Sequence, residues 1–190
     1  MSARFVHLHL HSEYSLVDST IRIPELVAAC VARKLPAVAM TDQNNLFALV
    51  KFYKAAEKAG IKPIAGADVL IAVGSVAASR ITLLCRDQDG YLSLSQLLTR
   101  AWMEGQRHDG VVARPAWLKS NKGLFALAGL NAEPGQLFTS GRHELAEQSL
   151  ADLQSAFGER LHLELTRCGR PGEDAFNAFA LDMAGRRGIP

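Results

Sequence analysis

The chain has 190 residues, of which 48% are hydrophobic, and its formal net charge at pH 7 is only +2. This length is enough to bury a substantial core, and the near-balance of charge excludes a polycation that binds nucleic acid through overall charge. The sequence has no apolar stretch long enough to span a membrane. Its three cysteines lack Cys-x-x-Cys spacing, which favours free buried thiols in a reducing cytoplasm.

Strands and helices are predicted to alternate along the chain. The predicted strands cover residues 4–10, 37–40, 62–65, 69–73, 81–85, 124–128 and 161–165, and the predicted helices cover residues 24–34, 46–59, 89–105, 143–157 and 172–187. Strands separated by helices favour a mainly parallel sheet, either open or closed into a barrel. Residues 186–190 lead from a helix toward a further strand, so we expect a domain truncated before its last strands.

Three histidines at alternate positions, His7, His9 and His11, are the most informative feature of the first predicted strand. Successive side chains of a strand point to opposite faces, so the three imidazoles share one face and the apolar residues between them share the other. The apolar face predicts burial against helices. The imidazole row predicts a metal site at the carboxyl end of the strand, where α/β folds place their ligands.

Longer runs of sequence carry a family resemblance. They cover residues 5–18, the run Ala39-Met-Thr-Asp-Gln-Asn-Asn-Leu46, and residues 50–68, and shorter matches continue to Pro171. Together they resemble the amino-terminal PHP (polymerase and histidinol phosphatase) domain of bacterial replicative DNA polymerase III alpha subunits. The resemblance implies an α/β fold, a distorted (β/α)-barrel of the PHP type. Residues 1–190 would then form the N-terminal part of a single PHP domain, with the polymerase domains absent from this part.

The resemblance also implies a trinuclear metal site in members that keep their ligands. His9 and His11 match the opening pair of that site, and Asp18 matches the acidic ligand that follows. Asp68 stands where a glutamate is expected, so a shorter carboxylate remains. These four residues are the candidate metal ligands of the chain.

Two other positions of the family's site have lost their ligands. Gln43 replaces a histidine and Leu130 replaces a cysteine. An amide oxygen is a poor substitute for an imidazole around a transition metal, and a leucine side chain ligates nothing. The final Asp-x-His motif of the family would follow Pro190. We therefore expect a vestigial site that holds no metal or one weakly bound divalent ion, and no catalytic residues in this part.

The functional hypothesis is a scaffold within a replicative DNA polymerase. The resemblance implies a parent chain that is a nucleotidyltransferase using Mg²⁺, that meets DNA through its polymerase domains, and that assembles with other replicase subunits. A damaged metal site fits an arrangement in which a separate proofreading exonuclease subunit docks on the PHP domain. We expect residues 1–190 to be inactive alone.

Two alternatives remain open at this point. The first is a metal-dependent phosphoesterase, or a residual 3′–5′ proofreading nuclease, that uses His9, His11, Asp18 and Asp68. The second is an unrelated amidohydrolase-type barrel, which also opens with His-x-His and which a carbamylated lysine would favour. His162 and Glu164 alternate on the predicted strand at 161–165 and could line the mouth of the barrel, but a solvated face is the preferred interpretation.

Overall fold

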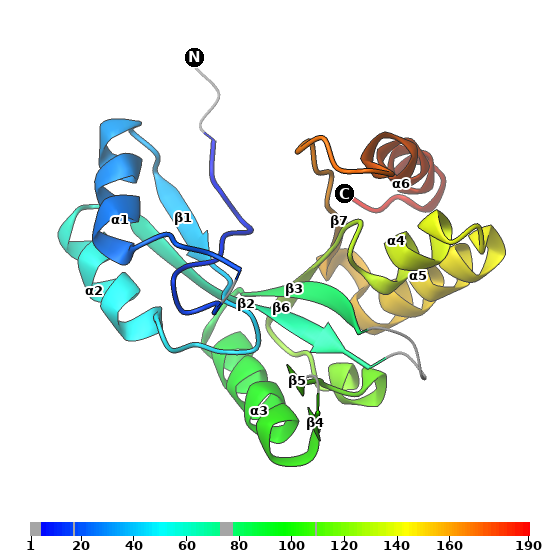
Figure 1. The fold of residues 1–190 in the computed structure, drawn as a ribbon, viewed down its shortest axis with the longest axis horizontal. Helices are drawn as coiled ribbons and strands as arrows, with labels where there is room; N and C mark the ends of the chain where they lie inside the picture. The colour runs from blue at the N-terminus through cyan, green and yellow to red at the C-terminus, as the bar shows by residue number, and fades with distance from the viewer. Residues whose placement is uncertain (1–4, 17, 73–77, 109) are drawn as a thin grey trace.

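The computed structural model describes residues 5–16, 18–72, 78–108 and 110–190. The central sheet of this described part has the strand order β1 (Ala37–Met40), β2 (Lys62–Ile71), β3 (Ser79–Cys85), β6 (Leu124–Ala128) and β7 (Leu161–Leu163). A separate two-stranded ribbon pairs β4 (Gln106–Arg107) with β5 (Gly110–Val111) (Figure 1). The predicted α/β class is confirmed.

The strands of the sheet do not all run in the same direction. β1 pairs with β2, and β6 with β7, in parallel, but β3 is antiparallel to both β2 and β6. The segment that joins β2 to β3 covers only residues 72–78, whereas a crossover between parallel strands needs a dozen or more residues. The expectation of a mainly parallel sheet therefore fails at β3.

β2 is one strand where the sequence predicts two. Gly66 lies in the gap between the predicted strands, and it stays in the ladder opposite Leu84. A Cβ atom at position 66 would lie only 2.6 Å from the carbonyl oxygen of Leu83, so glycine permits the close approach of β3. The predicted end of this region, Val73, lies outside the described residues.

The five predicted helices are all present. They are α1 (Ile23–Ala32), α2 (Leu49–Lys58), α3 (Gln88–Glu104), α5 (His143–Phe157) and α6 (Glu173–Arg187). The sequence analysis missed α4 (Glu133–Thr139) and the 3₁₀ turns η1 (Pro115–Lys119) and η2 (Gly158–Arg160). α4 is short and includes Pro134 and Gly135, two poor helix formers, although proline is well tolerated in the first turn.

The amino-terminal segment is not the regular strand that was predicted from residue 4. It follows β1 in parallel through one bridge, His7 with Val38, and the carbonyl of His7 accepts a hydrogen bond from the Ala39 amide at 2.8 Å. The amide of Leu10 instead donates to the Thr41 hydroxyl, which interrupts the ladder. Leu8 is 41% exposed, so the predicted burial of its face is also wrong. Residue 4 lies outside the described residues.

Helices cover one face of the sheet and leave much of the other face open. α1 and α2 pack on β1 around Val38 and Phe52, and a larger core joins β2, β3 and β6 to α3 and α5 (Figure 1). On the opposite face, the described residues form a small buried cluster of Ala39, Leu84 and Leu127, against which Ile64 and Phe125 pack. An open apolar cavity of about 820 Å³ adjoins this cluster.

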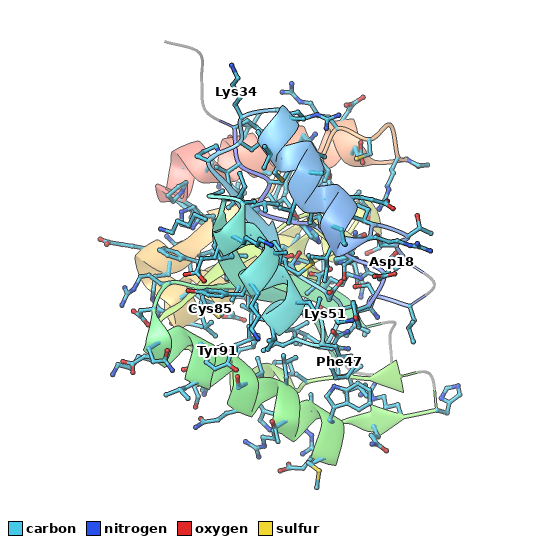
Figure 2. The ribbon with its side chains drawn as sticks, turned by 90° about the vertical axis from the view of Figure 1, so that its left-hand side faces the viewer. Asp18, Lys34, Phe47, Lys51, Cys85 and Tyr91 are labelled. Atoms are coloured by element: carbon cyan, nitrogen blue, oxygen red, sulfur yellow. The ribbon has the colours of Figure 1, made fainter. Side chains whose placement is uncertain are left out.

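The outer surface includes large apolar side chains. Phe47, just before α2, is 66% exposed, and Tyr91 on α3 is 38% exposed (Figure 2). The three cysteines are free, as predicted, but Cys85 is only half-buried and Cys168 is exposed, so the predicted burial holds for Cys30 alone. None of the described helices has the length and apolar character needed to cross a membrane.

Candidate metal centre

Polar side chains from distant parts of the chain line one pocket of about 640 Å³. The pocket lies where the amino-terminal segment, β2, the start of β3 and the end of β7 come together. The polar residues that line it include the four candidate ligands, His9, His11, Asp18 and Asp68. They also include three residues that were not predicted as ligands, Arg80, Thr82 and Glu164. The predicted ligands are therefore brought together, and His7 is not among the residues that line the pocket.

Asp68 is the centre of the group. Its side chain is fully buried, and its Oδ2 atom lies 3.3 Å from His9 Nε2 and 3.1 Å from His11 Nε2. Its Oδ1 atom accepts a hydrogen bond of 2.8 Å from the Thr82 hydroxyl. Thr82 is the residue directly opposite Asp68 in the β2–β3 ladder, so the sheet itself sets this contact.

His9 is held from both sides. Its Nδ1 atom lies 2.6 Å from Glu164 Oε1, and its Nε2 atom faces Asp68. Glu164 directly follows β7, and its side chain passes over Gly129, where a Cβ atom would lie 2.6 Å from Glu164 Oε2. The interpretation of Glu164 as part of a solvated face is therefore wrong. Its place at the end of a predicted strand was the signal that could have identified it.

His11 bridges two carboxylates. Its Nδ1 atom hydrogen-bonds Asp18 while its Nε2 atom faces Asp68. Asp18 precedes α1 at the rim of the pocket, and its side chain is 40% exposed (Figure 2). By contrast, His7 is exposed and packs edge-on against Phe5, with 4.6 Å between ring centroids, so the three imidazoles do not share one function.

The carboxylates change the protonation of the histidines. Burial opposes a charge on His9, but hydrogen bonds and charges of Asp68 and Glu164 outweigh it and raise the pKa of His9 to about 10. Burial also opposes the charge on His11, whose pKa is raised by Asp68 and Asp18. Burial disfavours the Asp68 carboxylate, yet hydrogen bonds from His11 and His9 hold its pKa well below the usual value. The His9 imidazole is therefore a cation at neutral pH, and His11 holds its proton to a higher pH than a free imidazole does.

Asp42 serves the local structure rather than the pocket. Its side chain accepts hydrogen bonds of 2.7 Å from the Ser12 amide, the Ser12 hydroxyl and the Ser15 hydroxyl. The residue is 1% exposed. Both carboxylate oxygens are thus used to fix the turn that follows His11.

The two replaced positions also lie at this site. Gln43 Oε1 accepts a hydrogen bond of 3.0 Å from Arg80 Nη2, and Leu130 lines the pocket. Arg80 Nη1 lies 3.7 Å from both Asp18 Oδ2 and Asp68 Oδ2. The sequence analysis missed Arg80 because an arginine on a predicted strand carries no metal-site signature by itself.

The pocket fits only part of the metal site that the resemblance implies. His9, His11 and Asp68 each offer a ligand atom, and these atoms lie within 4.8 Å of one another, so this group can hold one ion. A cluster does not fit, because the side chain at 130 is a hydrocarbon and the amide at 43 is bonded to an arginine. The guanidinium also stands beside the central carboxylate, where a second cation would be repelled.

Comparison with known proteins identifies the class. The sequence profile of the PHP domain matches residues 7–168, so the chain belongs to the PHP domain family. A crystal structure from Bifidobacterium adolescentis, described as that of a metal-dependent phosphoesterase, has a similar fold: it superposes with a TM-score of 0.68 at 14% identity, over 97% of this chain and 84% of that one. An amidohydrolase structure from Chromobacterium violaceum, with bound sulfate and no metal, gives a TM-score of 0.66 at 19% identity, over 98% of this chain and 84% of that one.

Curated relatives of this chain belong to one kind of protein that contains a PHP domain. DNA polymerase III subunit alpha of Xylella fastidiosa (strain 9a5c) is 56% identical over 205 residues, which cover 100% of this chain and 17% of that protein. The same subunit of Escherichia coli (strain K12) is 37% identical over 98% of this chain and 16% of its own length. The chain therefore spans about a sixth of the relatives that it matches, and it is homologous to part of DNA polymerase III alpha subunits.

Proposed function

We propose that this chain is the PHP domain of a replicative DNA polymerase and serves that enzyme as a scaffold with a degenerate metal site. The parent chain would be a cytoplasmic DNA-directed DNA polymerase. It would use Mg²⁺ and assemble with other replicase subunits. Its proofreading exonuclease subunit would dock on this domain. The observation that carries the scaffold role is that the central carboxylate of the pocket, Asp68, is already shared by two histidines and an arginine.

The chemistry of the pocket supports a structural role over hydrolysis. Hydrolysis of a phosphoester by this type of site needs closely spaced cations that polarise the phosphoryl oxygen and lower the pKa of a bound water. His9, His11 and Asp68 offer ligands for one ion, and Asp18 is a further candidate ligand from the sequence. His11 and Asp18 are also bonded to each other. The same contacts tie the amino-terminal segment to β2 and to the end of β7, which is what a scaffold requires.

The rival functions have less support. A phosphoesterase or nuclease would use the same four residues, but it lacks ligands at positions 43 and 130. An amidohydrolase with a carbamylated lysine has none in this pocket, because no lysine is among the described residues that line it. The likeness to an amidohydrolase structure is one of fold.

Two measurements on the full-length chain test the proposal. Calorimetric titration with the exonuclease subunit of the same cell should give binding at physiological salt, with slower hydrogen exchange localised within residues 5–190. Binding without any protection in this region would place the dock elsewhere and contradict the scaffold role. Primed DNA alone should leave hydrogen exchange in this region unchanged, because its net charge of +2 supplies no basic excess.

The second measurement is removal of a 3′ nucleotide from primed DNA in magnesium, manganese or zinc. We expect no removal above background. Reproducible removal that is abolished by His9→Ala and by His11→Ala would establish the nuclease alternative, whereas a contaminating nuclease would survive both substitutions.

A further inference from the structure

Arg80 occupies a position that the metal chemistry of the pocket does not explain. It lies on β3 two residues before Thr82, so its side chain is on the face that meets Asp68. Its Nη1 atom lies 3.7 Å from Asp68 Oδ2 and 3.7 Å from Asp18 Oδ2. One guanidinium thus stands between two carboxylates that the family resemblance assigns to metal ions.

The side chain at position 43 completes this arrangement. Gln43 Oε1 accepts a hydrogen bond of 3.0 Å from Arg80 Nη2, the other terminal nitrogen of the same guanidinium. The backbone of Gln43 forms a parallel β-bridge with that of Asp68, so the side-chain amide of Gln43 and the carboxylate of Asp68 both reach Arg80. An amide oxygen is a neutral acceptor at every pH, whereas an imidazole accepts only when it is unprotonated. Glutamine therefore suits a fixed cation better than the histidine it replaces.

We propose that Arg80 is the resident cation of this pocket: its guanidinium takes the place of a divalent ion between Asp18 and Asp68, and Gln43 positions it there. The replacement of the histidine at position 43 and the position of Arg80 then have one explanation. The loss of the histidine ligand at 43 removes a metal ligand and at the same time creates the acceptor that orients the arginine.

The proposal has two physical consequences. Without Arg80, Asp18 and Asp68 would lose a neighbouring positive charge, so the pocket would become less stable when no metal is present. The approach of a divalent ion to His9, His11 and Asp68 would no longer be opposed by the guanidinium. Removal of the arginine charge should therefore weaken the apo domain and strengthen metal binding together. This inference does not depend on which partner docks on the domain.

The test uses four variants of the full-length chain. Arg80→Met and Arg80→Gln remove the charge, Arg80→Lys keeps it, and Arg86→Met is the matched control. Arg86 lies just beyond the same strand, is exposed and pairs with Asp87. Zn²⁺ and Mn²⁺ are titrated into each protein by calorimetry, and thermal unfolding is followed with EDTA and with Zn²⁺.

We expect Arg80→Met and Arg80→Gln to unfold at a lower temperature in EDTA, to recover with Zn²⁺, and to bind Zn²⁺ at least about tenfold more tightly than wild type. Arg80→Lys and Arg86→Met should bind Zn²⁺ as wild type does. Equal affinity in wild type and Arg80→Gln would overturn the proposal, and so would a gain in Arg80→Lys equal to that in Arg80→Gln. If Arg80→Met does not fold, the pair Arg80→Gln and Arg80→Lys decides the outcome.

Discussion

His9 and Glu164 are 155 residues apart in sequence, and their Nδ1 and Oε1 atoms lie 2.6 Å apart across the mouth of the pocket. This contact joins the amino-terminal segment, at one edge of the sheet, to the end of β7 at the other. The segment pairs with β1 through the bridge of His7 with Val38, and it is also held by hydrogen bonds to Thr41, Asp42 and Asp68. The ion pair therefore contributes directly to the position of the segment.

Replacement of Glu164 should loosen the amino-terminal segment. Glu164→Ala removes a charged hydrogen bond, worth about 1.5–3 kcal/mol, and leaves His9 with one carboxylate partner. The amides of Ala39 and Thr41, which donate to the segment, should then exchange with solvent roughly tenfold to a hundredfold faster. Hydrogen exchange measured by mass spectrometry checks this. Glu159→Ala, at an exposed glutamate, is the control, and equal exchange in both variants would refute the role given to Glu164.

The stability of the domain should fall as the pH rises above neutrality. The pKa of His9 is raised to about 10 because Asp68 and Glu164 outweigh the effect of burial. A raised histidine pKa stabilises the fold fully below its unfolded value of about 6.5, and this contribution is lost as the pH rises toward about 10. The slope is at most about 1.4 kcal/mol per pH unit for one proton.

The measurement is the difference in unfolding temperature between wild type and His9→Gln, taken in EDTA at several pH values between 7 and 10. The difference should shrink as the pH rises, because only the wild type loses the proton on residue 9. Both proteins contain the same lysines, tyrosines and cysteines. The effect of their titration on the unfolding temperature therefore cancels in the difference. A constant difference would mean that His9 is not a cation in the folded protein.

Asp42 should matter more for folding than Asp18, although only Asp18 lines the pocket. Asp42 is buried and accepts three hydrogen bonds of 2.7 Å, so Asp42→Ala leaves Ser12 and Ser15 without their acceptor. The expected loss of stability is about 3 kcal/mol or more. Asp18→Ala removes a 40% exposed group and should cost less than about 1 kcal/mol. Thermal unfolding in EDTA compares the two, and the reverse order would contradict this assignment.

Restoration of the lost ligands should restore metal affinity. Gln43→His with Asp68→Glu and Leu130→Cys, made in the full-length chain, should raise the affinity for Zn²⁺ or Mn²⁺ by at least about tenfold and increase heat stability in the presence of metal. Calorimetric titration measures the affinity, and circular dichroism verifies that the triple variant is folded. Unchanged affinity in a folded variant would show that the pocket no longer has the geometry of a metal site.

Much of the fold was predictable from local patterns. β1 and β6 are short, buried runs of apolar residues, and both were predicted with the right bounds. The direction of β3 was not predicted, because it depends on the short connection after β2 rather than on the residues of the strand. α4 was missed because a seven-residue helix that contains proline and glycine has almost no periodic signal.

The candidate site was predictable only in part, for a different reason. The spacing of His9 and His11 is a local feature, so the sequence could place both imidazoles together. Glu164 contacts His9 and Arg80 lies beside Asp68. They come from the end of β7 and from β3, far along the chain, and only the sheet brings them to the same pocket. For Glu164 the one local signal was its place at the end of a predicted strand. An isolated arginine has no pattern that distinguishes a buried ion pair from a solvated charge.

The metal content of the purified protein is the most direct test of the degenerate site. Zinc and manganese are measured by elemental analysis after dialysis, on full-length wild type and on His9→Ala. We predict less than about one equivalent of either metal in wild type, and no loss in His9→Ala, because the pocket contains its own cations. Two or three tightly held ions per chain, lost on substitution of His9, would contradict the account.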